Sequence, residues 1–379
     1  MKKVNNNRLK RVLHVVSAMN RGGAETLLMN VYRNINKEHL QFDFIVHRQD
    51  KGDYDDEITS LGGKIYRISS LGHSGPVAYL KELRKIMSLE PYVAVHAHTD
   101  YQSGFPALAA KMAGIQRRIC HSHSNHYPKG NQLKEKSVLA VLKSIIKYSA
   151  TDYCACSFEA ARFLFGRRLV DENKIHMLKN SIDIEPFIEM NDGAKRSVKE
   201  ELHIPMDAKL IGHVGHFSQS KNHSFILKTL NRLLVENKNV YVVFAGDGPL
   251  RKQIEDEAKA LSVFERVRFI GVRSDIPRLM KAFDVFLFPS LFEGFGIVTI
   301  EAQCAGTPCV VSEEVPISTD MNLDLMKFLS LHTGIELWAE AIEEAFDKIR
   351  PTKEKIFDQI AQKGFDIKRN VSDWEQLYA

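Results

Sequence analysis

The chain has 379 residues, of which 44% are hydrophobic and 26% are charged, a balance that is typical of globular proteins. A chain of this length is expected to form two or three domains, and no apolar run reaches the roughly 18 residues that a membrane-spanning helix needs. The formal net charge of +5 is too small to indicate a nucleic-acid partner. The five cysteines form no C-x-x-C pair and mostly lie in apolar runs, which predicts reduced thiols and a cytoplasmic protein.

Short apolar runs rich in Val, Ile and Phe alternate with longer amphipathic stretches in the first half of the chain. This alternation predicts parallel strands that are joined by crossover helices. The expected strands are Val12–Ser17, Phe42–His47, Ile65–Ile68, Val93–His98, Arg118–His123, Tyr153–Ser157 and Ile175–Leu178. Helices are expected at Ala24–Ile35, Val77–Leu89 and Leu133–Ser149.

The strand and helix pattern stops in a polar segment, Ile184–Pro205, and then begins again. The expected strands of the second half are Leu210–Val214, Val240–Ala245, Val267–Ile270, Val285–Phe288, Cys309–Val311 and Lys327–Leu329. The final stretch, Glu354–Tyr378, is polar and has a helical pattern. The restart predicts an α/β chain of two doubly wound domains with a linker near residues 180–185, whose ligands lie beyond the carboxyl ends of the strands.

Two glutamates, Glu293 and Glu301, flank a glycine turn that leads from an expected strand into an expected helix. Gly294 and Gly296 allow the backbone to approach a ligand, and the N–H groups of the first helical turn suit an anion or a hydroxyl-rich ring. Two glutamates on one helix usually mark a solvated face. Because Glu301 lies among apolar neighbours, we interpret the pair instead as carboxylates that grip a polyol.

This segment, with the residues Ala302 to Pro308 that follow it, resembles the signature of the family-4 glycosyltransferases. The resemblance covers nearly the whole chain and is shared with enzymes of capsular and exopolysaccharide biosynthesis. It implies the GT-B architecture, in which two facing Rossmann-like domains are crossed by a returning C-terminal helix. The acceptor-binding domain is expected at residues 1–182, the nucleotide-sugar-binding domain at 183–360 and the returning helix at 361–379.

The resemblance implies roles for residues of the second domain. Glu301 is expected to hold the ribose hydroxyls of the donor, whereas Glu293 and the backbone of Phe295–Ile297 hold the transferred sugar. Lys221, which follows the strand Leu210–Val214 and a loop, is expected to steady the diphosphate as the leaving group departs. The alternative for Lys221 is a solvated lysine at the end of a loop.

The positive charge around the diphosphate departs from the family pattern. His216 stands where an arginine is typical, and a neutral histidine supplies neither a permanent charge nor a bidentate fork. The substitution could weaken donor affinity, could make it pH-dependent, or could be compensated by an arginine elsewhere, such as Arg273. In the first domain, Gly22 and Gly23 open a helix after the first strand, and the resemblance implies that they face the donor diphosphate.

Histidines gather where two strands of the first half end, with His96 and His98 on one strand and His121 and His123 on the next. Alternating histidines on a strand can share a zinc ion, but no cysteine or acidic ligand lies at a suitable spacing, and the resembled family is metal-independent. The resemblance implies that a histidine at this position touches the transferred sugar. His123 fits that position best, and His121 is the alternative.

The segment 126–149 holds five lysines and one glutamate among apolar residues. A basic helix that is apolar over much of its surface suits anionic lipid headgroups, which predicts a peripheral membrane contact. The alternative is a core helix with a lysine-rich outer face. A membrane contact would place the protein at the inner face of the membrane.

Together the residues and the resemblance predict a retaining, metal-independent hexosyltransferase that uses no cofactor. Its donor is expected to be a nucleoside-diphosphate sugar, with UDP as the leading nucleotide, and its acceptor a glycan or lipid-linked saccharide of surface polysaccharide biosynthesis. One alternative is a nucleotide-sugar epimerase of the same architecture. Another is a non-catalytic sugar-nucleotide-binding subunit, because His216 is atypical and the glycine loop of many relatives is replaced by Glu314–Ser318.

Overall fold

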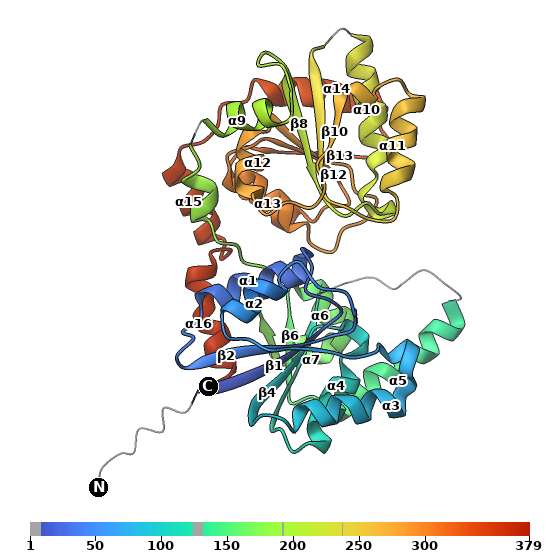
Figure 1. Ribbon diagram of the computed structural model, residues 1–379, viewed down its shortest axis with the longest axis vertical. Coiled ribbons are helices and arrows are strands. Elements are labelled where there is room, and N and C mark those ends of the chain that lie inside the picture. The colour runs from blue at the N-terminus through green and yellow to red at the C-terminus, as the bar shows by residue number, and fades with distance from the viewer. Residues whose placement is uncertain (1–8, 124–131, 192, 237) are drawn as a thin grey trace. The chain divides into compact units, whose positions relative to one another are not determined.

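The computed structural model describes residues 9–123, 132–191, 193–236 and 238–379, with the backbone alone for residues 132–136. The chain forms two compact units, one made of residues up to Ile182 together with Ile367–Ala379 and the other of Asp183–Asp366 (Figure 1). The expected boundary at residue 360 falls inside helix α15 (Lys353–Gln362), which belongs to the second unit. The chain returns to the first unit with helix α16 (Ile367–Leu377), because the apolar side chains of that helix complete the first core.

The first unit contains a seven-stranded parallel sheet with the strand order β3-β2-β1-β4-β5-β6-β7. Each of the seven expected strands is confirmed to within two residues at either end. Their bounds are β1 Lys10–Val16, β2 Leu40–Val46, β3 Ile65–Arg67, β4 Tyr92–Ala97, β5 Arg117–Ser122, β6 Asp152–Ala155 and β7 Ile175–Met177.

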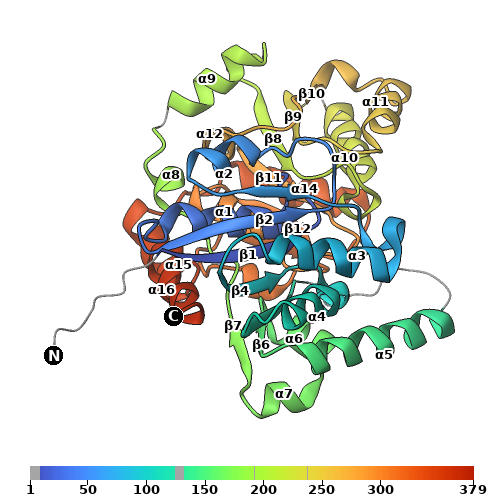
Figure 2. The ribbon, with the colours of Figure 1, turned by 60° about the horizontal axis from the view of Figure 1, so that its bottom comes forward.

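Helices cover both faces of this sheet. Alternate residues of β1 point to opposite faces, so that Val12 packs with α1 and α16 while Leu13 packs with α3 and α4. Figure 2 shows α3 and α4 next to one another. The helices of the unit are α1 Gly23–Asn34, α2 Asp55–Ser60, α3 Leu71–Met87, α4 Gly104–Met112, α5 Gln132–Ser149, α6 Phe158–Phe165, α7 Arg167–Asp171 and α16.

The second unit contains a six-stranded parallel sheet with the order β10-β9-β8-β11-β12-β13. All six expected strands of the second half are confirmed. Their bounds are β8 Lys209–Val214, β9 Val240–Ala245, β10 Val267–Phe269, β11 Val285–Phe288, β12 Cys309–Ser312 and β13 Met326–Leu329. The helices are α8 Glu185–Ile188, α9 Gly193–Glu201, α10 His223–Val235, α11 Arg251–Ala260, α12 Ile276–Ala282, α13 Ile297–Cys304, α14 Ile335–Phe346 and α15.

The polar segment at the start of the second unit is not a plain linker, because it contains helices α8 and α9. Helix α9 buries only Ala194, Val198 and the stem of Lys199, so its apolar stripe is too thin to give a clear pattern. The ammonium of Lys199 donates hydrogen bonds to the carbonyl oxygens of Met206 and Ala208, each at 2.6 Å. These bonds satisfy the buried cation and tie α9 to the start of β8.

Both sheets reverse their strand order at the first strand, between β1 and β4 in one unit and between β8 and β11 in the other. Loops that leave neighbouring strands in opposite directions open a crevice beyond the carboxyl ends of those strands. In the first unit this rule points to the loops after β1 and β4 as a candidate binding region, and in the second unit it points to the loops after β8 and β11.

Candidate active site

An ion pair between Lys221 and Glu293 lies at the reversal point of the second sheet. Lys221 ends a short 3-10 helix (Gln219–Lys221) that follows β8, and Glu293 lies in the loop after the neighbouring strand β11. The Lys221 Nζ contacts the Glu293 Oε2, and only 19% and 14% of the two side chains are exposed. The ammonium also lies 4.7 Å from the ring centre of Phe288. The structure therefore brings together the two predicted residues that carry opposite charges.

The loop after β8 is held against the loop after β9 by backbone contact. Phe217 donates a backbone hydrogen bond of 3.0 Å to Asp247, and a side chain at Gly246 would begin 2.1 Å from the carbonyl oxygen of Gly215. Glycine is therefore required at residue 246 for the two loops to approach. His216 lies within this loop pair with an exposed side chain, so that its ring is open to a ligand.

The amino terminus of helix α13 begins immediately after the glycine turn. Gly296 has a left-handed backbone with φ of 79° and caps the helix without a side chain. The N–H of Thr299 donates to the carbonyl oxygen of Gly296 at 2.9 Å, whereas the N–H groups of Ile297 and Val298 have no partner within the helix and can bind an anion or a hydroxyl. The side chains of Phe295 and Ile297 are buried, at 8% and 7% exposure, so only their backbone can face a ligand. The backbone role that was expected for Phe295–Ile297 stays a prediction.

Glu301 lies on α13 and keeps a partly exposed side chain. Protein atoms surround most of its carboxyl group, and the resulting loss of solvation raises the pKa of that group to about 7. No described residue forms a hydrogen bond or ion pair with this carboxyl group in the structure. A desolvated carboxylate without a partner is poised to accept hydrogen bonds from the hydroxyl groups of a ligand.

Arg273 is engaged by carboxylates and does not supply a free cation. Its guanidinium forms two hydrogen bonds of 2.8 Å with Asp275 and one of 2.7 Å with Glu201. These hydrogen bonds raise the pKa of Arg273 further above its ordinary value. Arg278 joins both carboxylates, so the four side chains form a network between α9 and the start of α12. The proposed compensation of His216 by Arg273 therefore has no support in this geometry.

In the first unit, Gly22 and Gly23 open helix α1 after β1. Gly22 is the capping residue, and a side chain there would begin 2.2 Å from the Glu25 Oε2, which folds back over it. Burial raises the pKa of Glu25. A side chain at Gly23 would meet no atom within 4 Å. A side chain at residue 22 would require the flexible carboxylate of Glu25 to move, whereas Gly23 leaves open space at the amino end of the helix.

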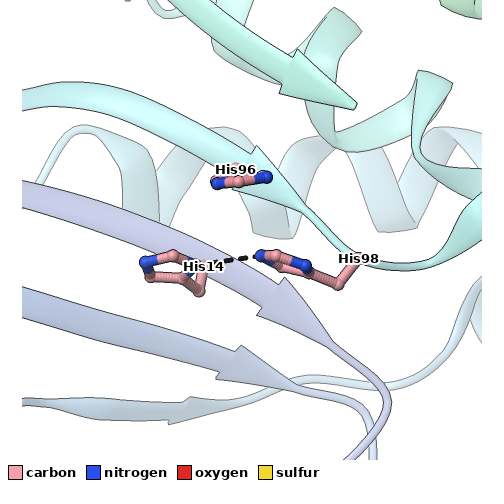
Figure 3. Close-up of side chains that lie close together, drawn as sticks. All are labelled: His14, His96 and His98. Carbon is pink, nitrogen blue, oxygen red and sulfur yellow. Dashed lines mark hydrogen bonds between the residues drawn. The ribbon is translucent and has the colours of Figure 1, made fainter. Parts of the chain in front are cut away.

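Five histidines point to one face of the first sheet. They lie on β1, β4 and β5 or directly after β4 and β5. They are His14, His96, His98, His121 and His123, of which Figure 3 shows the first three. The residue that was expected to touch the sugar, His123, stacks on His121 with a distance of 4.0 Å between ring centres. Its backbone N–H donates to the Asp100 Oδ1 at 2.8 Å, and burial lowers its pKa to about 4. The imidazole of His123 is therefore neutral at pH 7.

Two triads in this cluster, His14 with His96 and His98, and His98 with His121 and His123, bring nitrogen atoms within 4.8 Å of one another. A zinc ion needs lone pairs that converge at roughly 2.0–2.1 Å from each nitrogen, in the plane of each ring. The rings of His96 and His98 are stacked 4.2 Å apart at 29°, and those of His121 and His123 are stacked 4.0 Å apart at 19°. Nearly parallel rings cannot direct their lone pairs to one point, so this geometry favours hydrogen bonds over a shared ion.

The basic segment 126–149 coincides with helix α5 from residue 132 onward. Residues 126–131 and the side chains of residues 132–136 lie outside the part of the chain that the structure describes. Val138, Val141 and Tyr148 are 54%, 61% and 68% exposed. An apolar hollow of about 430 Å³ between α4 and α5 is lined by Leu108, Ala140, Val141, Ser144, Ile145 and Tyr148. No helix in the described ranges combines the length and apolarity needed to cross a bilayer.

Known families and proteins match both units of the chain. The family described as Glycosyltransferase Family 4 matches residues 21–186, and the family described as Glycosyl transferases group 1 matches residues 194–363. EpsF of Bacillus subtilis (strain 168), named as a glycosyltransferase, is 43% identical over 374 residues, which are 98% of this chain and 97% of that protein. The capsular polysaccharide biosynthesis glycosyltransferase CapH of Staphylococcus aureus is 26% identical over 97% of this chain and 98% of that protein.

A further relative is the Escherichia coli UDP-Gal:alpha-D-GlcNAc-diphosphoundecaprenol alpha-1,3-galactosyltransferase, which is 26% identical over 80% of both chains. Among solved structures, Anabaena HepE in complex with UDP and glucose matches with a TM-score of 0.76 at 19% identity, over 97% of this chain and 98% of that chain. This likeness shows the fold. The expected family and architecture are thereby confirmed, and the chain belongs to the family-4 glycosyltransferases of the GT-B type.

Proposed function

We propose that the protein is a retaining hexosyltransferase that moves a sugar from a nucleoside-diphosphate donor to a lipid-linked saccharide in surface polysaccharide biosynthesis. The observation that carries the proposal is the arrangement around the reversal point of the second sheet. There the ion pair of Lys221 and Glu293 joins two adjacent loops, and the amino terminus of α13 follows Glu293, with the unpartnered carboxyl group of Glu301 farther along that helix. Such a set offers one cation, one anion-binding helix end and two carboxylates to a charged, hydroxyl-rich ligand.

In this proposal Glu301 accepts hydrogen bonds from the ribose hydroxyls, and Lys221 contacts the diphosphate. A diphosphate that draws the ammonium away would release Glu293, which then accepts hydrogen bonds from the hydroxyls of the transferred sugar. The exposed ring of His216 adds hydrogen bonds to the phosphates without a fixed charge. Gly22 and Gly23, at the amino end of α1, also contribute to binding the diphosphate, and His123 contacts the sugar.

Retention of the anomeric configuration is assigned to the donor itself. The leaving phosphate oxygen accepts the proton of the incoming hydroxyl on the same face of the sugar, while Lys221 offsets the charge that develops on the diphosphate. Charge stabilisation by an ammonium performs the task that a metal ion performs in other transferases, which supports a metal-independent reaction. UDP is the proposed nucleotide, supported by the E. coli relative named for UDP-Gal and by HepE, which was solved with UDP.

The acceptor is proposed to be a saccharide on a lipid carrier at the cytoplasmic face of the membrane. Two relatives support this acceptor, one named for capsular polysaccharide and one for a diphosphoundecaprenol-linked sugar. The exposed apolar residues of α5 and the adjacent Lys147 supply a surface that suits a bilayer of anionic lipids. This surface would bring the chain to its acceptor without a spanning helix.

The test begins with a thermal-shift screen of nucleotides and nucleotide sugars on the purified chain, because a ligand that binds only the folded state raises the melting temperature. Donors that bind are then incubated with lipid-linked saccharides, and the anomeric configuration of the product is read by NMR with and without EDTA. An inverted product or a loss of activity in EDTA would contradict the proposed mechanism. Isomerised donor in the absence of any acceptor would instead identify an epimerase, and binding without turnover would identify a sugar-nucleotide-binding subunit.

A further inference from the structure

The C-terminal helix α16 and Tyr378, which follows it, lie against the histidines of the first sheet. The Tyr378 hydroxyl is 2.6 Å from the His96 Nδ1, and the His96 Nε2 is 3.2 Å from the His121 Nδ1. The ring centre of Trp374 lies 5.6 Å from that of His96 and 5.9 Å from that of His121. Trp374 and Tyr378 are themselves 0% and 2% exposed, so this end of the chain helps to shield both imidazoles from water.

His14 belongs to the same layer, on the neighbouring strand β1. Its ring centre lies 6.2 Å from that of Tyr378, and its Nδ1 is 3.0 Å from the His98 Nε2 (Figure 3). The side chains of His14, His96 and His121 are all fully buried. Three titratable rings are therefore packed between the sheet and the last segment of the chain.

Burial keeps these three imidazoles neutral. Loss of solvation lowers the pKa of His14 to about 3, and it lowers the pKa values of His96 and His121 well below their ordinary value of 6.5. Burial also raises the pKa of Tyr378, whose hydroxyl is therefore uncharged. Among the described residues, no carboxylate forms an ion pair with any of the three rings. A proton on one of them would be a buried charge without a partner, which is costly.

The surrounding groups of the sheet give a protonated ring little support. The carboxylate of Asp100 lies at the edge of the cluster, where its Oδ1 accepts the backbone N–H of His123 at 2.8 Å. Burial raises the pKa of the Cys154 thiol on β6, so this group is neutral at pH 7. His176 on β7 can only add positive charge, and its proximity lowers the pKa of His96.

The charged side chains of the covering helices are exposed or engaged elsewhere. Glu375 of α16 accepts a backbone N–H from the loop after α1 at 3.0 Å. On α1, Glu25 folds back over Gly22, and Arg33 forms an ion pair with Glu57. The exposed charged residues of α16 are Lys368, Arg369 and Asp373.

Helix α16 can separate from the sheet without breaking a strand, because it is the last element of the chain. Its polar ties include the Ile367 N–H, which donates to the Ile182 carbonyl at 3.0 Å, and the Asn370 Nδ2, which donates to the Ser181 Oγ at 2.6 Å. Terminal segments open at a lower free energy than core strands do. Opening of α16 would bring the three shielded rings into contact with water.

Opening of α16 is thereby linked to the uptake of protons. A histidine in water has a pKa of about 6.5, so the rings of the open form take up protons as the pH falls below that value. The rings of the closed form stay neutral over the same range. The open form therefore gains up to a factor of about ten for each pH unit and each histidine, whereas above about pH 7.5 the equilibrium does not depend on these groups.

We propose that His14, His96 and His121 form a proton-sensitive latch, which holds α16 on the first sheet at neutral pH and favours its reversible release when the pH falls below about 6.5. Carboxyl groups with ordinary pKa values stay charged down to about pH 5.5, so the histidines dominate the response above that pH. No ligand takes part in the latch, and the purified full-length chain is sufficient for its test.

Hydrogen exchange of the α16 amides, read by mass spectrometry in the presence of EDTA, measures the latch. After correction for the intrinsic exchange rate, we expect the opening constant of α16 to rise about 10³-fold from pH 7.5 to pH 5.5, which is about tenfold for each of the three histidines. The amides of β1 and β4 should stay protected over this range. Return to pH 7.5 should restore the protection of α16.

His14→Phe removes one ring from the latch and replaces it with an apolar ring beside the phenylalanines of β2. The rise should then fall to about 10²-fold. Tyr378→Phe is the matched control, because it removes the hydroxyl that contacts His96 but removes no imidazole. It should raise the opening constant equally at both pH values and leave the ratio unchanged. His73→Asn, which changes an exposed histidine on α3, should behave like the wild type.

A rise of less than tenfold in the wild type, or an equal rise in His14→Phe and the wild type, would overturn the proposal. Simultaneous exchange of α16 and β1 would also overturn it, because the histidines would then act on the whole unit and not on the helix. Should His14→Phe fail to fold, the ratio in the wild type and the comparison of α16 with β1 still decide the question.

Discussion

Lys221 and Glu293 are 72 residues apart in the sequence and form an ion pair beside the reversal point of the second sheet. The pair places a neutralised cation next to the amino terminus of α13. A diphosphate offers the ammonium more negative charge than one carboxylate does, and we expect exchange of partners when a donor binds. The ion pair keeps Lys221 in place and limits the cost of a partly buried charge in the free protein.

The first prediction separates the structural role of this pair from its role in transfer. Lys221→Met leaves the Glu293 carboxylate without its partner, so we expect a loss of about 1–3 kcal/mol in the free energy of unfolding and a fall in kcat of about 10²–10³-fold. The double variant with Glu293→Gln should regain most of the stability, because no unpaired charge remains, but should stay inactive. Urea unfolding and a transfer assay measure the two effects.

Lys252→Met is the control for that experiment, since Lys252 pairs with Asp256 on the surface and its side chain is 74% exposed. This variant should leave both stability and kcat unchanged. An active double variant would show that neither Lys221 nor Glu293 takes part in transfer.

The second prediction concerns Glu301, whose burial destabilises the fold at neutral pH. Its pKa is raised from 4.5 to about 7 in the folded chain, so the cost is absent below pH 4.5, grows between about pH 4.5 and 7, and is constant above that range. Glu301→Gln removes an ionisable group, and we expect it to raise the free energy of unfolding at pH 8 by up to about 3 kcal/mol. At pH 4.5 the variant and the wild type should be equally stable.

The same variant should lose nucleotide binding, because an amide cannot accept from two ribose hydroxyls as a carboxylate does. Melting curves at pH 4.5 and 8, with and without UDP, measure both effects. Glu340→Gln, which changes an exposed glutamate on α14, should show neither effect. Equal stability of Glu301→Gln and wild type at pH 8 would show that this carboxyl group is not desolvated in the folded chain.

Most strands could be predicted from the sequence because they lie in short apolar runs rich in Val, Ile and Phe. The motifs around Glu293 and Lys221 were visible because each is local in the sequence. Their ion pair was not predictable, because it depends on the adjacency of β8 and β11, which joins residues far apart in the chain. His14 was missed in a similar way. It stands alone among apolar residues of β1, and only the register of β1 against β4 places it opposite His96.

The partners of Arg273 show a second limit. Glu201 lies on helix α9, in a segment whose polar composition hid the helix, so the arginine appeared free in the sequence. Thin amphipathic helices that bury a lysine stem leave too weak a periodicity to be recognised. The partners of Arg273 could not be foreseen because this helix was missed, and its role in binding the donor stays a prediction.

The third prediction concerns the histidine that replaces the arginine of the family pattern. His216 is exposed in the loop after β8, so a longer side chain can be accommodated there. His216→Arg should lower the Kd for UDP about tenfold at pH 7.5, because a guanidinium adds a permanent charge and a bidentate fork for phosphate.

His39→Arg, at an exposed position before β2, adds the same charge away from the site and should leave the Kd unchanged. Calorimetric titration with UDP measures both, and equal affinities for His216→Arg and wild type would remove residue 216 from the phosphate site.

The fourth prediction tests the membrane surface on α5. Val138 and Val141 are 54% and 61% exposed on that helix, and Lys147 lies exposed farther along it. Replacing both valines with serine removes apolar surface that would enter the headgroup region, so binding to vesicles that contain anionic lipid should weaken about tenfold.

Val235→Ser is the matched control, because Val235 is 71% exposed at the end of α10 in the other unit, and it should bind like the wild type. Sedimentation with vesicles measures the effect, and transfer to a detergent-solubilised acceptor should be unchanged in all variants. If the double variant binds vesicles as tightly as the wild type, α5 is a helix whose outer face is merely solvated.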